Sequence, residues 1–288
     1  MSKKILIISI VCLVVVGMLI WSRVEAPRIG NTDEPSLRVV ASFYPLAEFA
    51  TQVGGDNAHV VSLTPTGVEP HDFDPSPQDI ASVTSADVFI YNGAGLEPWV
   101  DRILPDLQAH GVTIVRATDH IALDGADPHV WLDPLLAREQ VKTIASAMSV
   151  SPDAYLTKLD VLDAEFTGGL KQCKRRELVT SHNALHYLAK RYGLQTVSIS
   201  GISPYEEPTP RRLAEIADFV KAHGVTHIFF ETLVSPRLSE TIAKETGVKT
   251  IAFNPLEGLT DEEIAQGKTY ISVQRENLAA IRTALGCI

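Results

Sequence analysis

Short runs of β-branched and aromatic residues alternate along the chain with segments whose apolar residues recur at helical spacing. The runs cover residues 37–42, 59–63, 87–92 and 113–117 in the first half, and 177–181, 195–200, 226–231 and 248–253 in the second. Runs of this length predict buried strands, and the segments between them predict helices. Alternation of strand and helix is typical of βαβ units, in which the strands of a sheet run parallel.

A long helical stretch without a strand-like run separates the two halves. Its apolar face comprises Leu156, Leu159, Leu162 and Phe166. The pattern therefore predicts an α/β fold with two lobes, each a parallel sheet flanked by helices, joined by a long spine helix. The predicted boundaries are 37–148 for the N-terminal lobe, 149–176 for the connecting helix and 177–288 for the C-terminal lobe.

The start of the chain has the pattern of an export signal. Two lysines precede an apolar run at residues 5–21, and this order is typical of secretory signals. The run is about 17 residues long, the short limit for a membrane span, and Pro27 would obstruct cleavage just before it. Residues 1–26 are predicted to be a cleaved signal peptide or a retained signal anchor, and 27–36 a polar spacer.

Export and charge together narrow the class of protein. Export predicts an oxidising compartment, where disulfides persist. Beyond the signal segment only Cys173 and Cys287 remain, and such a pair predicts one disulfide that ties the last helix to the middle of the chain. Two separate buried thiols are the alternative. The net charge of -10 argues against nucleic acid as a partner, because an acidic protein does not neutralise phosphates.

Three histidines stand where predicted strands end. His71 lies in VEPHDFDPSPQD, His129 in ADPHVWLDP and His182 in VTSHNALHYLAKRYGL. In α/β sheets ligands bind outside the carboxyl ends of the strands, and neutral imidazole suits zinc. Because two of the histidines come from the first half and one from the second, we predict a metal site between the lobes.

A fourth ligand would come from the second lobe and be acidic. Glu257 in FNPLEGL and Glu231 in FFET both follow predicted strands. We prefer Glu257, because a proline stiffens its loop as it does the loops of the first two histidines. Glu231 is the alternative ligand, or a group that holds backbone amides or orients a ligand histidine. Asp72, beside His71, is a further candidate for such a supporting or alternative role.

Each of these residues also has a simpler interpretation. A single histidine after a strand is most often a turn or surface residue. The aspartates of these loops have capping of helices or turns as their alternative role: Asp72, Asp74, Asp127 and Asp133. His182 and His186 are four residues apart and could bind a metal on one helix face, although Asn183 stands where a zinc protease has glutamate.

Five segments resemble, in order and spacing, the zinc/manganese family of solute-binding proteins of ABC importers. They are PHDFDPSPQD, DPHVWLDP, SHNALHYLAKRYGL, ISPYEEPTPRRL and NPLEGLT, spread over roughly residues 37–288. The resemblance implies two α/β lobes bridged by a rigid helix, with one metal ion in the cleft. It also implies the ligands His71, His129 and His182, with an acidic group from the last loop.

The resemblance also bears on the last ligand and on the metal. Many members carry aspartate where this chain has Asn254, but the form NPLEGL is similar to members that use its glutamate, so Glu257 takes the role. Manganese-type members tend to carry glutamate where His182 stands, and three imidazoles favour Zn²⁺ over the harder Mn²⁺. Cys173 and the terminal ALGC are similar to zinc-type members that have a disulfide.

We therefore predict a zinc-binding protein that is exported to the periplasm or the outer face of the cell membrane, with its N-terminal segment either cleaved or retained as a tether. The resemblance implies a monomer without catalytic turnover that delivers zinc to a membrane permease powered by a cytoplasmic ATPase. Three alternatives remain: the same role for manganese or iron, a zinc-dependent hydrolase with Glu231 as its base, and an adhesin on the same scaffold.

Overall fold

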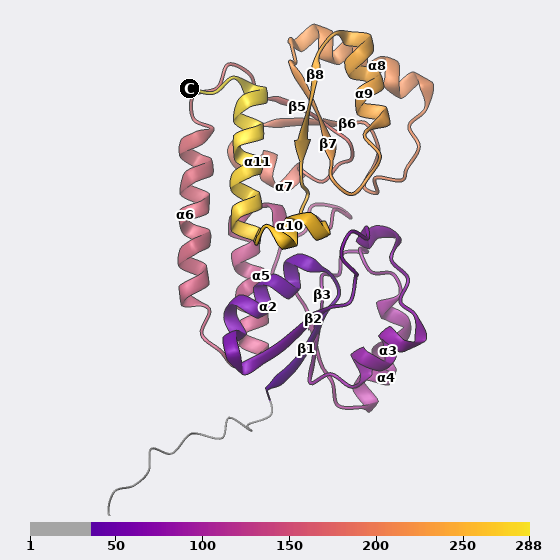
Figure 1. Ribbon diagram of the computed structural model, residues 1–288, viewed down its shortest axis with the longest axis vertical. Coiled ribbons are helices and arrows are strands. Elements are labelled where there is room, and N and C mark those ends of the chain that lie inside the picture. The colour runs from indigo at the N-terminus through magenta and orange to yellow at the C-terminus, as the bar shows by residue number, and fades with distance from the viewer. Residues whose placement is uncertain (1–35) are drawn as a thin grey trace, which may run out of the picture. The chain divides into compact units, whose positions relative to one another are not determined.

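Two parallel four-stranded sheets form the centre of the structure, a computed structural model that describes residues 36–288 (Figure 1). The strand order of the first sheet is β2 (Ala58–Ser62), β1 (Leu37–Ala41), β3 (Val88–Tyr91), β4 (Thr113–Arg116). The order of the second is β6 (Gln195–Ser198), β5 (Glu177–Thr180), β7 (His227–Glu231), β8 (Lys249–Phe253). The predicted signal segment, 1–26, and the spacer as far as residue 35 lie outside the described residues.

Helices flank both sheets. The N-terminal lobe contains α2 (Tyr44–Gly54), α3 (Pro77–Thr84), α4 (Val100–Ala109) and α5 (Pro134–Ala147). The C-terminal lobe contains α7 (His186–Tyr192), α8 (Pro210–His223), α9 (Arg237–Thr246), α10 (Asp261–Ala265) and α11 (Tyr270–Leu285). Ser76 caps α3 and Thr209 caps α8, so these helices begin where their hydroxyl groups satisfy free amides. Within residues 36–288, no helix combines the length and the apolar character needed to cross a membrane.

The spine helix α6 (Asp153–Gly169) packs against α5 and α11 (Figure 1). Leu159, Leu162 and Phe166 are buried on its inner face, as their spacing predicts. The helix ends before the predicted Arg176, because Gly168 and Gly169 are poor helix formers. The predicted α/β fold, with two parallel-sheet lobes joined by a spine helix, is confirmed.

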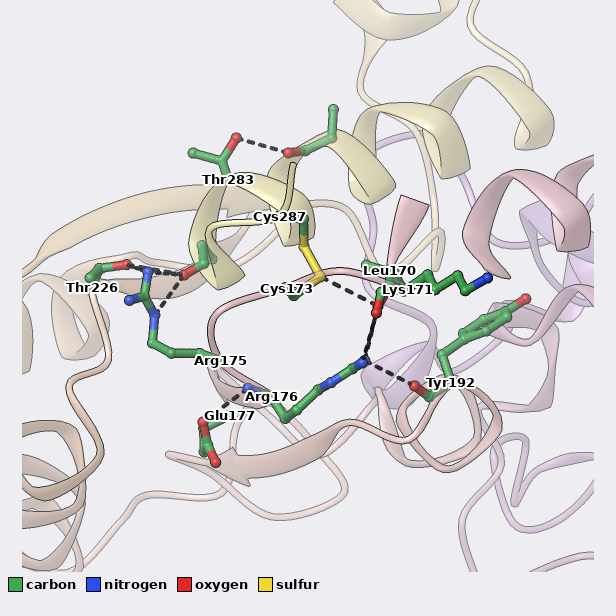
Figure 2. Close-up of a disulfide and its surroundings, with 12 residues drawn as sticks. Leu170, Lys171, Cys173, Arg175, Arg176, Glu177, Tyr192, Thr226, Thr283 and Cys287 are labelled. Atoms are coloured by element: carbon green, nitrogen blue, oxygen red, sulfur yellow. Dashed lines mark hydrogen bonds between the residues drawn. A yellow bond between two sulfur atoms is a disulfide. The ribbon is translucent and has the colours of Figure 1, made fainter. Parts of the chain in front are cut away.

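A disulfide joins Cys173, just beyond the spine helix, to Cys287 at the end of the chain (Figure 2). The predicted pairing is therefore present, and it spans 114 residues of sequence. Beside it the Arg175 guanidinium donates to the Ala284 carbonyl at 3.2 Å and to Thr226 Oγ1 at 3.3 Å. These contacts attach the last turn of α11 to the second sheet.

One apolar core continues from the first lobe into the second. It includes Phe43 and Trp131 on one side and Leu256 and Tyr270 on the other. The Tyr270 hydroxyl donates to the Trp131 carbonyl at 2.6 Å, and Trp131 Nε1 donates to the Pro255 carbonyl at 2.8 Å. Opening the lobes widely would expose this apolar surface to water, at a free-energy cost of about 25 cal/mol for each Å² exposed. We therefore expect only small movements of one lobe relative to the other.

Candidate metal centre

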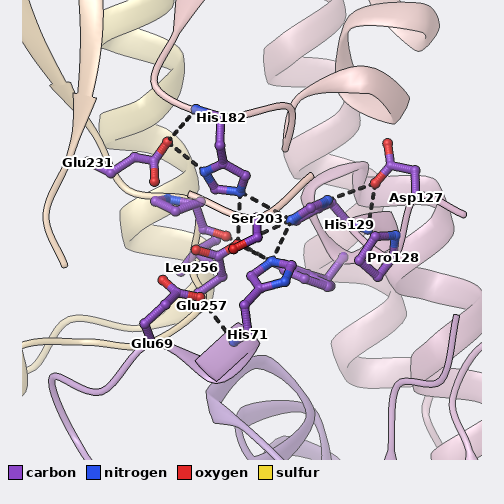
Figure 3. Close-up of polar contacts among 12 residues, drawn as sticks. Glu69, His71, Asp127, Pro128, His129, His182, Ser203, Glu231, Leu256 and Glu257 are labelled. Carbon is purple, nitrogen blue, oxygen red and sulfur yellow. Dashed lines mark hydrogen bonds and ion pairs between the residues drawn. The ribbon is translucent and has the colours of Figure 1, made fainter. Parts of the chain in front are cut away.

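The four predicted metal ligands converge between the two sheets (Figure 3). His71 lies in the 3₁₀ turn η2 (Pro70–Asp72), and His129 directly precedes the turn η3 (Val130–Leu132). His182 follows β5, and Glu257 lies in the connection from β8 to α10. One ligand atom from each residue lies within 4.8 Å of every other. Residues from four separate loops therefore meet at one point, as a site between lobes requires.

The contacts within this cluster are short and largely shielded from solvent. His129 Nε2 lies 3.1 Å from His71 Nε2 and 3.2 Å from His182 Nε2. Glu257 Oε1 lies 3.4 Å from Nε2 of His71 and 3.2 Å from Nε2 of each of the other two histidines. His129 and His182 are fully buried and Glu257 is 1% exposed, whereas His71 retains partial exposure.

Two carboxylates orient two of the imidazole rings. Asp127 Oδ1 lies 2.7 Å from His129 Nδ1 and also accepts from the His129 amide at 3.0 Å. Glu231 Oε1 lies 2.8 Å from His182 Nδ1 and accepts from the His182 amide at 3.2 Å. A neutral imidazole in this setting carries its proton on Nδ1, so its Nε2 lone pair points into the cluster.

Glu231 thus makes the contacts expected of a group that orients His182, one of the roles that the sequence left open for it. Asp127 has the same role toward His129, although the sequence suggested only a cap. The position of Asp127 two residues before a candidate ligand was the signal available. A carboxylate two residues before a histidine is close enough to contact the ring of that histidine.

Glu69 is a further residue of the site that sequence reasoning missed. It is 4% exposed, and its Oε1 accepts from the His71 amide at 3.3 Å. Burial, followed by the negative charge of Glu257, raises the pKa of Glu69 well above its usual range. Its place two residues before His71 repeats the spacing of Asp127 and His129. Glu69 supports the backbone of its histidine, whereas Asp127 contacts the ring as well.

The charges of His182 and Glu257 depend on each other. Burial alone would lower the pKa of His182, but Glu257 and Glu231 outweigh it and raise that pKa well above its usual value. Burial alone would raise the pKa of Glu257, but His182 and the other two histidines hold it well below its usual value. A proton on His182 therefore balances the buried carboxylate in the absence of another cation.

The arrangement has the chemistry of a site for a soft or borderline cation. Neither oxygen of Glu257 accepts a hydrogen bond of normal geometry, although three ring nitrogens lie close to it. Two of those nitrogens are held with their lone pairs inward by Asp127 and Glu231. Three imidazoles and one carboxylate match the number and type of ligand that tetrahedral Zn²⁺ takes.

Two roles considered for neighbouring residues are not found in the structure, namely a supporting or capping role for Asp72 and the alternative metal pair His182 and His186. Asp72 is exposed and lies outside the converging group, and α3 is capped by Ser76 with Asp79 rather than by Asp72. His182 and His186 do not share a helix face, because α7 begins only at His186. The His186 ring turns instead toward Asp124, with Nε2 3.0 Å from the carboxylate.

The loop that carries His129 is held from the opposite lobe. Lys190 of α7 donates to the Asp124 carboxylate at 2.7 Å, and the Tyr187 hydroxyl donates to the Asp127 carbonyl at 3.0 Å. Arg191 of the same helix forms an ion pair with Asp133. His129 thus belongs to the first lobe by sequence, but contacts from both lobes hold its loop in place.

Comparison with known proteins decides the family. Residues 39–284 match the family model described as zinc-uptake complex component A, periplasmic. The chain belongs to this family. Its members are solute-binding proteins, so the resemblance predicted from the five segments is confirmed.

Two relatives show how far the similarity extends along the chain. The zinc-binding lipoprotein AdcA of Streptococcus pneumoniae is 40% identical over 276 residues, which cover 85% of this chain and 55% of AdcA. The high-affinity zinc uptake system protein ZnuA of Bacillus subtilis is 37% identical, with coverage of 89% of this chain and 90% of ZnuA. The chain therefore spans about half the length of streptococcal AdcA and most of the Bacillus protein.

Solved structures show the same fold. The Zn(II)-bound ZnuA-like domain of Streptococcus pneumoniae AdcA aligns with a TM-score of 0.77 at 41% identity, covering 87% of this chain and 99% of that domain. The laminin-binding protein of Streptococcus agalactiae, described as bifunctional with adhesin and metal-transporting activity, aligns with a TM-score of 0.79 at 36% identity, covering 86% and 99%. Both solved structures share the two-lobed scaffold on which the candidate metal centre is built.

Proposed function

We propose that this chain binds one Zn²⁺ through His71, His129, His182 and Glu257 outside the cell membrane and delivers it to the permease of an ABC importer. The observation that carries the proposal is the convergence of three histidine Nε2 atoms on a buried carboxylate that accepts no hydrogen bond of normal geometry from any described residue. A buried negative charge surrounded by nitrogen lone pairs is costly unless it is compensated, and a bound cation would compensate it. Membership of the zinc-uptake family supports zinc as that cation.

Zinc is favoured over manganese and iron by the ligand set. Manganese prefers oxygen ligands, whereas imidazole suits zinc, and three of the four proposed ligands are imidazoles. Replacing His182 with glutamate would give two imidazoles and two carboxylates. A shift of His182→Glu toward manganese would support this reading, and an unchanged zinc preference would count against it.

We further propose that the protein has no catalytic turnover. A zinc hydrolase needs an open coordination position for water and a base beside it. Here four protein groups surround the centre, and Glu231, the candidate base, is engaged by the amide and ring of His182. These contacts suit capture of a metal rather than activation of water.

The proposed place of action follows from the family and the disulfide. The family description names a periplasmic component of an uptake complex, and the Cys173–Cys287 disulfide suits an oxidising compartment. A permease is the partner that an uptake complex requires. We propose that the protein meets it as a monomer, which light scattering of the metal-loaded protein would test.

The test of zinc binding is a titration of the chelator-stripped protein, residues 36–288, with Zn²⁺ and Mn²⁺ while thermal unfolding is followed. Zinc at a hundredfold excess over Kd should stabilise the fold by about 2.7 kcal/mol, or roughly 5–10 °C for a chain of this size. His71→Ala and His182→Ala should abolish the gain. His110→Ala, at an exposed histidine after α4, should keep it. A zinc-dependent gain that survives both ligand substitutions would refute the proposed site.

A further inference from the structure

Behind the metal centre lies a buried polar network around Glu97, which is 7% exposed. Glu97 Oε1 accepts from Ser42 Oγ at 2.6 Å and from the Asn92 amide at 2.8 Å, and Oε2 accepts from the Gly93 amide at 3.0 Å. Ser42 follows β1 and Asn92 follows β3. The carboxylate therefore links the carboxyl ends of two neighbouring strands.

This network reaches the loops of both N-lobe histidines. The Asn92 side-chain amide donates to the Pro128 carbonyl at 3.0 Å, and Pro128 directly precedes His129. The Ser42 carbonyl accepts from the Thr64 amide at 3.0 Å and from Thr64 Oγ1 at 2.7 Å. Thr64 begins the loop that leads to His71. Both loops are thus connected to one carboxylate that does not itself touch the centre.

Asn92 is held by further buried partners. Gln140 of α5 donates to its side-chain oxygen at 2.9 Å, and Thr118 Oγ1 donates to its carbonyl at 2.7 Å. Gln140, Thr118 and Asn92 are all buried. The Gln140 side-chain oxygen has no hydrogen-bond partner among the described residues, but Asn92 itself uses its side-chain amide, its side-chain oxygen and its carbonyl in buried contacts. Buried hydrogen bonds of this kind restrain the groups they join, so a displaced Asn92 would carry the Pro128 carbonyl with it.

We propose that Glu97 is a positioning residue for zinc, which holds the His129 loop through Asn92 and the start of the His71 loop through Ser42. The proposal rests on the proposed zinc-binding function. Ligands must be held within about 0.5 Å of the productive geometry. Loss of a group that hydrogen-bonds a metal ligand directly typically costs about 10–100-fold in affinity, and Glu97 acts at least one contact further out, so we expect the lower end of that range. Burial raises the pKa of Glu97 to about 7, so keeping an ionised carboxylate here has a folding cost that its positioning role would explain.

The simpler alternative is that Glu97 only stabilises its own turn, since two of its three donors are the amides of Asn92 and Gly93. If Glu97 has a purely structural role, replacing it would lower the unfolding temperature but leave the zinc affinity and the ligand geometry unchanged. Two readouts separate the roles: the Zn²⁺ dissociation constant, measured by chelator competition, and the visible absorption of Co²⁺ in the site, which reports ligand geometry.

The experiment compares Glu97→Gln with Glu48→Gln, a control at a half-buried glutamate of α2 in the same lobe. Glu97→Gln should weaken zinc binding about tenfold and alter the Co²⁺ spectrum, and Glu48→Gln should change neither. Ser42→Ala, which removes one donor and keeps the carboxylate, should give a smaller loss in the same direction and serves if Glu97→Gln does not fold.

The possible outcomes separate this proposal from the proposed function. If wild-type protein binds zinc and the Glu97→Gln and Ser42→Ala variants bind it equally well with an unchanged Co²⁺ spectrum, the positioning role is refuted and zinc binding stands. If wild-type protein binds no zinc, both proposals are overturned.

Discussion

Replacing Glu231 with alanine tests whether the buried carboxylates behind the histidines tune the metal centre. Glu231 Oε1 engages His182 twice, at the ring Nδ1 at 2.8 Å and at the amide at 3.2 Å. Without it, the ring loses the contact that fixes its proton and its direction. Outer partners of this kind contribute 10–100-fold in metal affinity, which corresponds to about 1.4–2.7 kcal/mol.

The assay is the gain in thermal stability on adding zinc, compared with a direct dissociation constant. At fixed zinc concentration the gain depends on the logarithm of the affinity, so Glu231→Ala should reduce it by about 1.4–2.7 kcal/mol. For a chain of this size that is roughly 3–10 °C. Each variant is measured with and without zinc, because the substitution also removes two hydrogen bonds from the metal-free fold.

Three further variants sharpen the comparison. Glu231→Gln keeps an acceptor oxygen and should lose less affinity than Glu231→Ala. Asp127→Ala should lose about as much, since Asp127 makes the matching pair of contacts to His129. Glu240→Ala, at an exposed position of α9, should behave like wild type. A Glu231→Ala protein that binds zinc within about threefold of wild type would show that His182 is oriented by other contacts, contrary to the expected range.

Two other predictions follow from the charges and the disulfide. Because the pKa of His182 is raised well above its usual value of about 6.5, the stability that its proton confers on the metal-free fold is present below pH ~6.5 and is lost as pH rises through the raised pKa. Zinc needs the neutral ring, so chelator competition should show affinity still increasing above pH ~6.5, and a flat profile there would contradict the assigned ion pair with Glu257. Replacing Cys173 and Cys287 together with serine should lower stability by about 2–4 kcal/mol in denaturant unfolding. The double variant should bind zinc as wild type does. A loss of zinc binding free energy as large as the loss of unfolding free energy would mean that the disulfide also shapes the site.

Much of the fold and the four proposed ligands could be predicted from local patterns. Strands and helices followed from periodicity, and parallel pairing followed from their alternation. His129 lies twelve residues beyond the predicted run 113–117, and the family resemblance supports it most directly. His71, His182 and Glu257 could be found because each comes within eight residues of the end of a predicted strand, and the carboxyl ends of parallel strands meet at one edge of a sheet. This reasoning needs only the order of elements, which neighbouring residues determine.

The supporting residues depended on contacts between distant segments. Glu231 was ambiguous until β5 and β7 proved to be neighbours in the sheet, which places the end of β7 beside His182, 49 residues away in sequence. Asn92 hydrogen-bonds to Pro128, 36 residues away in sequence, and side chains of α7 in the other lobe hydrogen-bond to the His129 loop. Local sequence sets which groups are available, but the strand order and the packing of the lobes decide which of them meet, because hydrogen bonds and ion pairs act only over a few ångströms.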